Sequence, residues 1–139
     1  MTPVELRAIP IFSDVSDAGL ERIVSAAGEI DCEPGRVLTL PGDPGSGMFV
    51  ILEGYVTVEA RGAMYGLSQG DFFGELALLN PDAERVARVR AGSQVRCLAL
   101  PRDDALALIE SEPTLALAML KELARRLADA VDRSPADDD

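Results

Sequence analysis

The sequence predicts a mainly β fold, a sandwich or barrel of short strands with helices at both ends of the chain. Between residues 29 and 101, short segments of strand composition alternate with glycine-containing turns, which is typical of all-β sandwiches and barrels. Before and after this region, apolar residues recur at helical spacing, which favours flanking helices. Periodicity alone does not choose between the sandwich and barrel topologies.

The chain has the length and composition of one domain. Its 139 residues are 47% hydrophobic and 27% charged, ordinary values for a globular protein with a buried core. The apolar runs are shorter than a bilayer span, and the N-terminus lacks a basic head followed by a signal-type apolar core. We therefore expect a cytoplasmic protein.

Charge and missing residue types exclude several functions. The formal net charge is −11, so the overall field repels nucleic acid and anionic membranes. The chain has no histidine, which removes Ser-His-Asp and Cys-His machinery and histidine metal sites. We expect no enzyme, no metal and no cofactor, and no partnership with nucleic acid or membrane. Cys32 and Cys97 could form one disulfide, but two free thiols are expected in the cytoplasm.

Residues 1–28 are predicted to form a helical lead-in. A short helix is expected from Thr2 to Ala8. Ser16 can cap a second helix with Asp17 in its first turn, and Gly28 ends that helix. The apolar positions of the second helix fall at helical spacing: Leu20, Ile23, Val24 and Ala27.

Residues 29–101 form the predicted β region, with about seven or eight strands. Glycine and proline mark its turns at Pro34-Gly35, at residues 41–45, at Arg61-Gly62 and at residues 69–71. Seven segments between these turns have strand composition: Glu29–Glu33, Arg36–Leu40, Met48–Leu52, Tyr55–Glu59, Ala63–Leu67, Arg85–Ala91 and Gln94–Leu100.

Residues 102–133 are predicted to form two helices, Asp103–Ser111 and a longer one from Pro113 to about Asp132. The longer helix carries a wide apolar stripe: Ala116, Met119, Leu120, Leu123, Leu127, Ala130 and Val131. The stripe could serve core packing alone, or it could also meet a second copy of the chain and form a homodimer. Residues 134–139 have the composition of a disordered acidic tail.

The segment from Gln69 to Ala91 has the residues that best suit ligand binding. Gly74 lets the backbone approach a ligand closely, and a one-turn helix starting near Glu75 would present free N–H groups to an anion. Arg85 could bind a phosphate through two hydrogen bonds, while Glu75 could accept hydrogen bonds from sugar hydroxyls. A surface ion pair between Glu75 and Arg85 is the simpler alternative.

This segment resembles the phosphate-binding cassette of the cyclic nucleotide-binding domain family, in its catabolite-activator-like form. Gly74 to Leu79 matches the short cassette helix, and Glu84 to Ala87 matches the arginine segment. Turns and strands of the family correspond to other stretches of this chain: Pro34-Gly35, Gly42 to Gly45, Met48 to Gly54 and Leu100 to Asp103. The resemblance spans roughly Ile9 to Val131.

The resemblance implies an eight-stranded β-roll of the jelly-roll (double-stranded β-helix) type, with N-terminal helices and two C-terminal helices. It also implies that Arg85 holds the cyclic phosphate, that Glu75 holds the ribose 2′-hydroxyl, and that the last helix closes over the base. The implied ligand-binding set is Gly74, Glu75, Leu76, Ala77, Arg85, Val86 and Ala87.

The same resemblance predicts the ligand and the output. Members that favour cGMP often have threonine after the arginine, whereas Val86 has no hydroxyl, which indicates either cAMP as the ligand, with cGMP the alternative, or weak discrimination between the two. Ala130 and Val131 offer the base no polar group, so its recognition is hydrophobic or comes from elsewhere. No DNA-binding helix-turn-helix follows the long helix, which predicts a stand-alone sensor that signals by a helix shift to a protein effector or a dimer.

Two other functions remain to be weighed. The domain could be an interaction and dimerisation module that has lost its nucleotide. A β-barrel enzyme of the cupin kind would need metal-binding histidines, which this sequence lacks.

Overall fold

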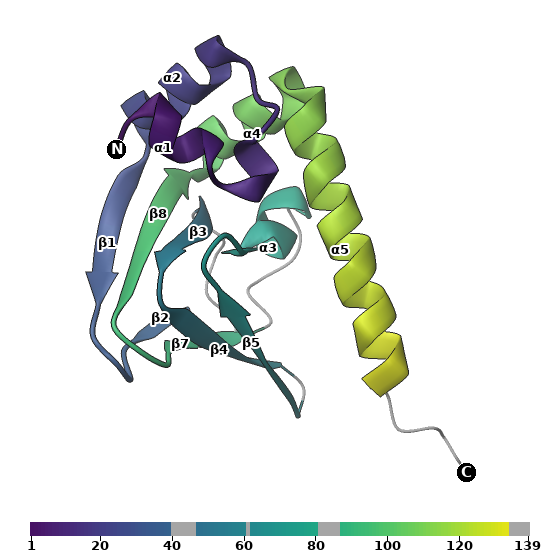
Figure 1. Cartoon of the computed structure of the whole chain (residues 1–139). Helices are drawn as coiled ribbons and strands as arrows, with labels where there is room; N and C mark the ends of the chain where they lie inside the picture. The colour runs from purple at the N-terminus through teal and green to yellow at the C-terminus, as the bar shows by residue number, and fades with distance from the viewer. Residues whose placement is uncertain (40–46, 61, 81–86, 134–139) are drawn as a thin grey trace.

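The computed structural model describes residues 1–39, 47–60, 62–80 and 87–133. Within these residues, eight strands form two four-stranded antiparallel sheets with the orders β1-β8-β3-β6 and β2-β7-β4-β5. The N-terminal helices and α4 lie together at one end of this β-roll, and α5 runs along its side (Figure 1). The predicted fold class, a mainly β roll with helices from both ends of the chain, is confirmed.

The strands are β1 (Gly28–Cys32), β2 (Val37–Thr39), β3 (Gly47–Glu53), β4 (Tyr55–Ala60), β5 (Ala63–Ser68), β6 (Phe72–Phe73), β7 (Arg88–Ala91) and β8 (Val95–Pro101). The helices are α1 (Pro3–Arg7), the 3-10 turn η1 (Pro10–Phe12), α2 (Asp17–Ala26), α3 (Glu75–Leu79), α4 (Arg102–Ser111) and α5 (Pro113–Arg133). Two of these elements, η1 and β6, have no counterpart among the predicted segments. The predicted segments that include Leu40 and Arg85–Val86 lie partly outside the described residues.

Strand β3 explains why one stretch of the sequence is continuously apolar. Successive side chains of β3 point to opposite faces of the strand, so Val50 packs into one hydrophobic core and Ile51 into another. Both faces of this strand are therefore buried, which removes the usual alternation of apolar and polar residues.

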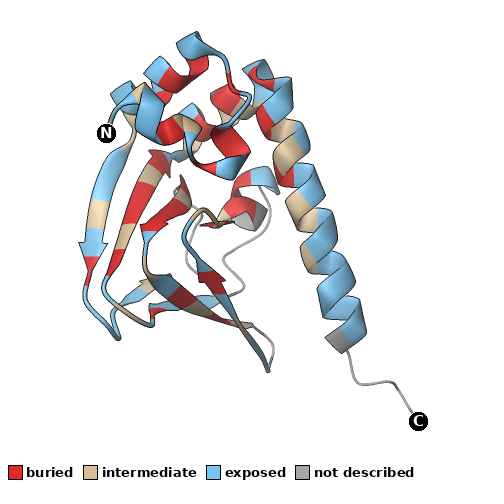
Figure 2. Ribbon diagram, viewed as in Figure 1, coloured by how far each residue is buried: buried red, intermediate tan, exposed pale blue. Residues whose placement is uncertain are grey.

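The first core lies between the β1-β8-β3-β6 sheet and the helices, and the second lies inside the roll between the two sheets. Figure 2 shows both as buried segments, while most of α5 beyond its first turns is exposed. Cys32 and Cys97 are buried, free thiols of the inner core. Burial raises the pKa of Cys97 to about 12, so this thiol stays protonated.

Helix α5 is the longest element, with 21 residues. Leu115 and Met119 in its first two turns are buried in the outer core, whereas Leu120 and Leu127 are 63% and 67% exposed. No helix among the described residues is both long and apolar enough to cross a membrane.

Candidate functional site

The predicted cassette begins with a sharp change of chain direction at Gly74. This residue joins β6 to α3 with a φ of +93°, a left-handed conformation that costs side-chain-bearing residues roughly 1–2 kcal/mol. The turn lets a helix start immediately after a strand. Glu75 is consequently the first residue of α3.

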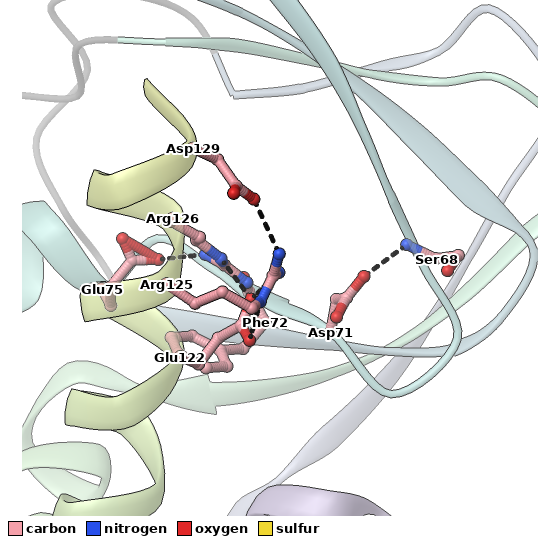
Figure 3. Close-up of polar contacts among 8 residues, drawn as sticks. All are labelled: Ser68, Asp71, Phe72, Glu75, Glu122, Arg125, Arg126 and Asp129. Atoms are coloured by element: carbon pink, nitrogen blue, oxygen red, sulfur yellow. Dashed lines mark hydrogen bonds and ion pairs between the residues drawn. The ribbon is translucent and has the colours of Figure 1, made fainter. Parts of the chain in front are cut away.

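Glu75 is buried although it has a carboxylate. Its exposed fraction is 6%, and a charge removed from water to this extent needs a partner. Arg126 of α5 provides one, because its Nη1 lies 3.5 Å from Oε1 of Glu75. The contact joins the cassette to the C-terminal helix (Figure 3).

Arg126 is held by four contacts at once. Besides Glu75, its Nε donates to Oε2 of Glu122 at 2.9 Å, and its Nη2 donates to the carbonyl oxygen of Phe72 at 2.8 Å. The guanidinium carbon lies 4.5 Å from the centroid of the Phe72 ring, within cation–π range. We call Phe72, Glu75, Glu122 and Arg126 the Arg126 cluster.

A neighbouring arginine extends this network along α5. Arg125 donates to both carboxylate oxygens of Glu122, at 3.0 and 2.6 Å, and to Asp129 at 2.8 Å. The hydrogen bond from Arg125, followed by that from Arg126, holds the pKa of Glu122 below its ordinary value. Glu122 therefore remains an anion that binds both arginines.

A pocket of about 360 Å³ lies beside the Arg126 cluster, between β5 and α5. Residues 64–67 of β5 form one wall, and α5 contributes Arg125, Arg126, Asp129 and Ala130 to the other. Its size is at the lower end of the range for small-molecule sites. One side of this β5–α5 pocket is mainly apolar, whereas the other carries both signs of charge.

These groups can bind a small polar ligand. The Glu75 carboxylate can accept hydrogen bonds from a ligand hydroxyl, and the pocket can enclose an apolar ring. Among the residues that the structure describes, no group of three or more His, Cys, Asp or Glu side chains could hold a metal ion.

The structure describes part of the predicted binding set. Gly74 and Glu75 adjoin one another at the start of α3, and Leu76 and Ala77 continue that helix. Ala87 directly precedes β7, and its carbonyl oxygen accepts a hydrogen bond from the Thr39 hydroxyl at 3.1 Å. Arg85 and Val86 lie outside the described residues, so the phosphate contact and the alternative Glu75–Arg85 ion pair both stay predictions.

Sequence reasoning missed Arg126, Phe72 and Glu122. The four-residue spacing of Glu122 and Arg126 on one helix was a visible signal of an ion pair. The third member, Glu75, is 51 residues from Arg126 in sequence, so local patterns could not connect them. Ala130 lines the β5–α5 pocket together with the charged Asp129 and Arg126.

Comparison with known proteins supports the resemblance. Residues 29–112 match the family model of the cyclic nucleotide-binding domain. A cyclic nucleotide-gated potassium channel of Rhizobium etli is 36% identical over 119 residues, covering 86% of this chain and 33% of the channel. A cAMP-dependent protein kinase regulatory subunit of Yarrowia lipolytica is 32% identical over 101 residues, covering 70% of this chain and 27% of the subunit. The chain thus spans about 30% of the length of these two relatives.

Solved structures agree. The catabolite activator protein of Thermus thermophilus superimposes with a TM-score of 0.71 at 30% identity, covering 87% of this chain and 59% of that one. The regulatory subunit of a cAMP-independent protein kinase A from Trypanosoma brucei gives a TM-score of 0.75 at 27% identity, covering 88% of this chain and 44% of that one.

Proposed function

The chain belongs to the cyclic nucleotide-binding domain family, and we propose that it is a non-enzymatic sensor whose ligand is cAMP. The observation that carries this proposal is the placement of Glu75. A buried carboxylate stands at the start of a short helix, directly after a left-handed glycine. The β5–α5 pocket adjoins the arginine that contacts this carboxylate.

In the proposed complex, Glu75 accepts a hydrogen bond from the ribose 2′-hydroxyl and Arg85 binds the cyclic phosphate. The rest of the cassette, Gly74, Leu76, Ala77, Val86 and Ala87, lies against the phosphate and ribose. The base enters the β5–α5 pocket, where Tyr65 offers ring surface. Asp129 can accept a hydrogen bond from the amino group of either purine, so the preference for adenine over guanine rests on Val86.

The proposed output is a movement of α5, because Arg126 joins this helix directly to the ribose-binding carboxylate. A ligand that contacts Glu75 changes the surroundings of Arg126 and so biases the position of α5. The channel and kinase-subunit relatives carry such a domain within longer proteins. A protein effector that senses α5 is therefore the proposed partner.

A second copy of the chain is another proposed partner. Along α5, exposed apolar residues recur at alternating spacings of three and four: Leu117, Leu120, Ala124, Leu127 and Val131. Such a heptad stripe is the pattern that pairs two helices in a coiled coil. We propose that this stripe forms a homodimer.

Titration calorimetry with cAMP and with cGMP tests the proposed ligand. We expect saturable heat with cAMP and weaker binding of cGMP. Absence of heat with both nucleotides at millimolar concentration, in protein shown by mass spectrometry to hold no co-purified nucleotide, would exclude the sensor function.

One observation favours a second function, an interaction module without a nucleotide. Glu75 is already paired with Arg126, and one structural neighbour is named as a regulatory subunit of a cAMP-independent kinase. Thermal melting separates the two functions, because a ligand that binds only the folded state raises the melting temperature by an amount that grows with the logarithm of its concentration relative to Kd. An unchanged melting temperature in millimolar cAMP and cGMP supports the interaction module.

A further inference from the structure

Glu112 lies at the joint between the last two helices. It caps the C-terminus of α4, where its backbone N–H donates to the carbonyl of Leu108 at 2.9 Å, and Pro113 starts α5 immediately afterwards. The residue is only 8% exposed although it is charged. Such burial requires specific partners.

The partners of Glu112 come from the other end of the chain. Its Oε1 accepts the backbone N–H of Ser16 at 2.9 Å, and its Oε2 accepts the Ser16 hydroxyl at 2.7 Å. The same hydroxyl accepts the N–H of Gly19 at 3.0 Å as the N-terminal cap of α2. Glu112 therefore completes the cap of α2, where a negative charge is favourable.

Two further features fix the position of Glu112 against the N-terminus of α2. A Cβ atom at Gly19 would lie 2.7 Å from Oε2 of Glu112 and 2.6 Å from Val15, so glycine permits the close approach. Two residues after Glu112, the Thr114 hydroxyl donates to the carbonyl oxygen of Asp14 at 3.0 Å. The base of α5 is thus bound twice to the loop that precedes α2.

A small change in the direction of α5 at Glu112 would move Arg126 by several ångströms. Arg126 lies fourteen residues beyond Glu112 on α5, which corresponds to about 21 Å of helix at 1.5 Å per residue. A tilt of about 10° at the joint would move Arg126 by roughly 4 Å over that length. Such a movement is comparable to the 3.5 Å separation between Arg126 Nη1 and Glu75 Oε1, so it would break their contact.

We propose that Glu112 is a positioning residue for the nucleotide site, which fixes the direction of α5 through Ser16 and so keeps Arg126 on Glu75. The effect on nucleotide binding rests on the proposed function. The effect on the direction of α5 concerns this chain alone and can be measured without ligand.

The first test measures the direction of α5 by electron spin resonance distances. Spin labels are placed at Ala128→Cys on α5 and Arg90→Cys on β7, both exposed positions, while the native thiols are buried. In Glu112→Ala we expect the distance distribution to shift or broaden by several ångströms. Glu110→Ala, which removes the same charge from an exposed site of α4, should leave the distribution unchanged.

Milder variants separate positioning from loss of folding. Glu112→Gln keeps an acceptor oxygen for Ser16 and should restore most of the original distribution, whereas Thr114→Val removes only the second contact and should shift it slightly. If Glu112→Ala does not fold, Glu112→Met replaces it, because this side chain has similar length but no oxygen to accept the Ser16 N–H or hydroxyl. An unchanged distribution in a folded variant that lacks the Ser16 contact overturns the proposal.

The second test is a double-mutant cycle in cAMP affinity. Glu112→Ala should weaken cAMP binding about threefold to tenfold in the parent protein but have little effect when Arg126→Ala is already present. If Glu112→Ala lowers cAMP affinity equally in the parent and in Arg126→Ala, then Glu112 does not act through Arg126. If the parent itself binds no cyclic nucleotide, the proposed function fails, and the distance measurement still decides the role of Glu112.

Discussion

Glu75 and Arg126 are 51 residues apart in sequence and lie 3.5 Å apart as an ion pair, with side chains that are only 8% and 15% exposed. The pair connects the first residue of the cassette helix to the long C-terminal helix. Any ligand that binds through Glu75 must therefore share or replace a contact that also holds α5.

Arg126→Ala removes all four contacts of this side chain and leaves a buried carboxylate without one of its partners. We expect a loss of unfolding free energy on the order of 1–3 kcal/mol and about tenfold weaker cAMP binding, because Glu75 loses the group that orients it. Denaturant unfolding and calorimetry measure both effects. Lys121→Ala, which removes a positive charge from an exposed site of α5, is the control. Losses of unfolding free energy and cAMP affinity no larger than those of Lys121→Ala would show that Arg126 does not orient Glu75.

Arg85→Ala tests the predicted phosphate contact. Losing a charge-assisted hydrogen-bonded pair costs on the order of 2–4 kcal/mol, so cAMP binding should weaken by at least thirtyfold with little change in melting temperature. Arg88→Ala, an exposed arginine of β7, should bind as the parent does. Retained affinity in Arg85→Ala would exclude this residue from the site.

Gly74→Ala places a side chain on backbone with a φ of +93°. We expect about 1–2 kcal/mol of lost stability, together with weaker nucleotide binding because the start of α3 shifts. Gly28→Ala is the matched control, since a Cβ there would meet no atom within 4 Å. Equal unfolding free energies for the two variants would show that the turn tolerates a side chain.

The stability contributed by Glu112 should depend on pH. Hydrogen bonds from Ser16, first from its backbone N–H and then from its hydroxyl, hold the pKa of Glu112 below the ordinary value. This stabilisation is fully present above the unfolded-state pKa, which is about 4.3 for glutamate, and is lost as the pH falls through the folded-state pKa. The stability difference between the parent and Glu112→Gln should therefore shrink from pH 7 to pH 3. A constant difference would contradict the assignment.

Leu127→Glu tests the proposed dimer. Leu127 is 67% exposed and belongs to the heptad stripe of α5 that runs from Leu117 to Val131. A charge at this position would repel the same charge in a second copy of the chain. We expect sedimentation analysis to give twice the chain mass for the parent and a single chain mass for the variant. Val4→Glu, at another exposed apolar residue, 82% exposed, should remain dimeric. A monomeric parent at high micromolar concentration would exclude the dimer.

Most secondary-structure elements could be predicted because their signals are local. Ser16 does cap α2, and the predicted one-turn helix does begin at Glu75. Strand β6 was missed because two residues, Phe72 and Phe73, are too few to show a periodic pattern; they form a strand only by pairing with Val50 and Phe49 of β3. The η1 turn is equally short.

The β-roll topology was implied only by the family resemblance. The residue pattern by itself determined the mainly β class with helices at both ends of the chain, and the local part of the candidate site, Gly74 followed by Glu75. These depend on backbone preferences and residue types that act over a few positions. Only the tertiary structure decided that Arg126 pairs with Glu75 and that Glu112 completes the cap of α2. Both contacts are made by buried charges, and the partner of a buried charge is selected by the packing of distant elements rather than by its neighbours in the chain.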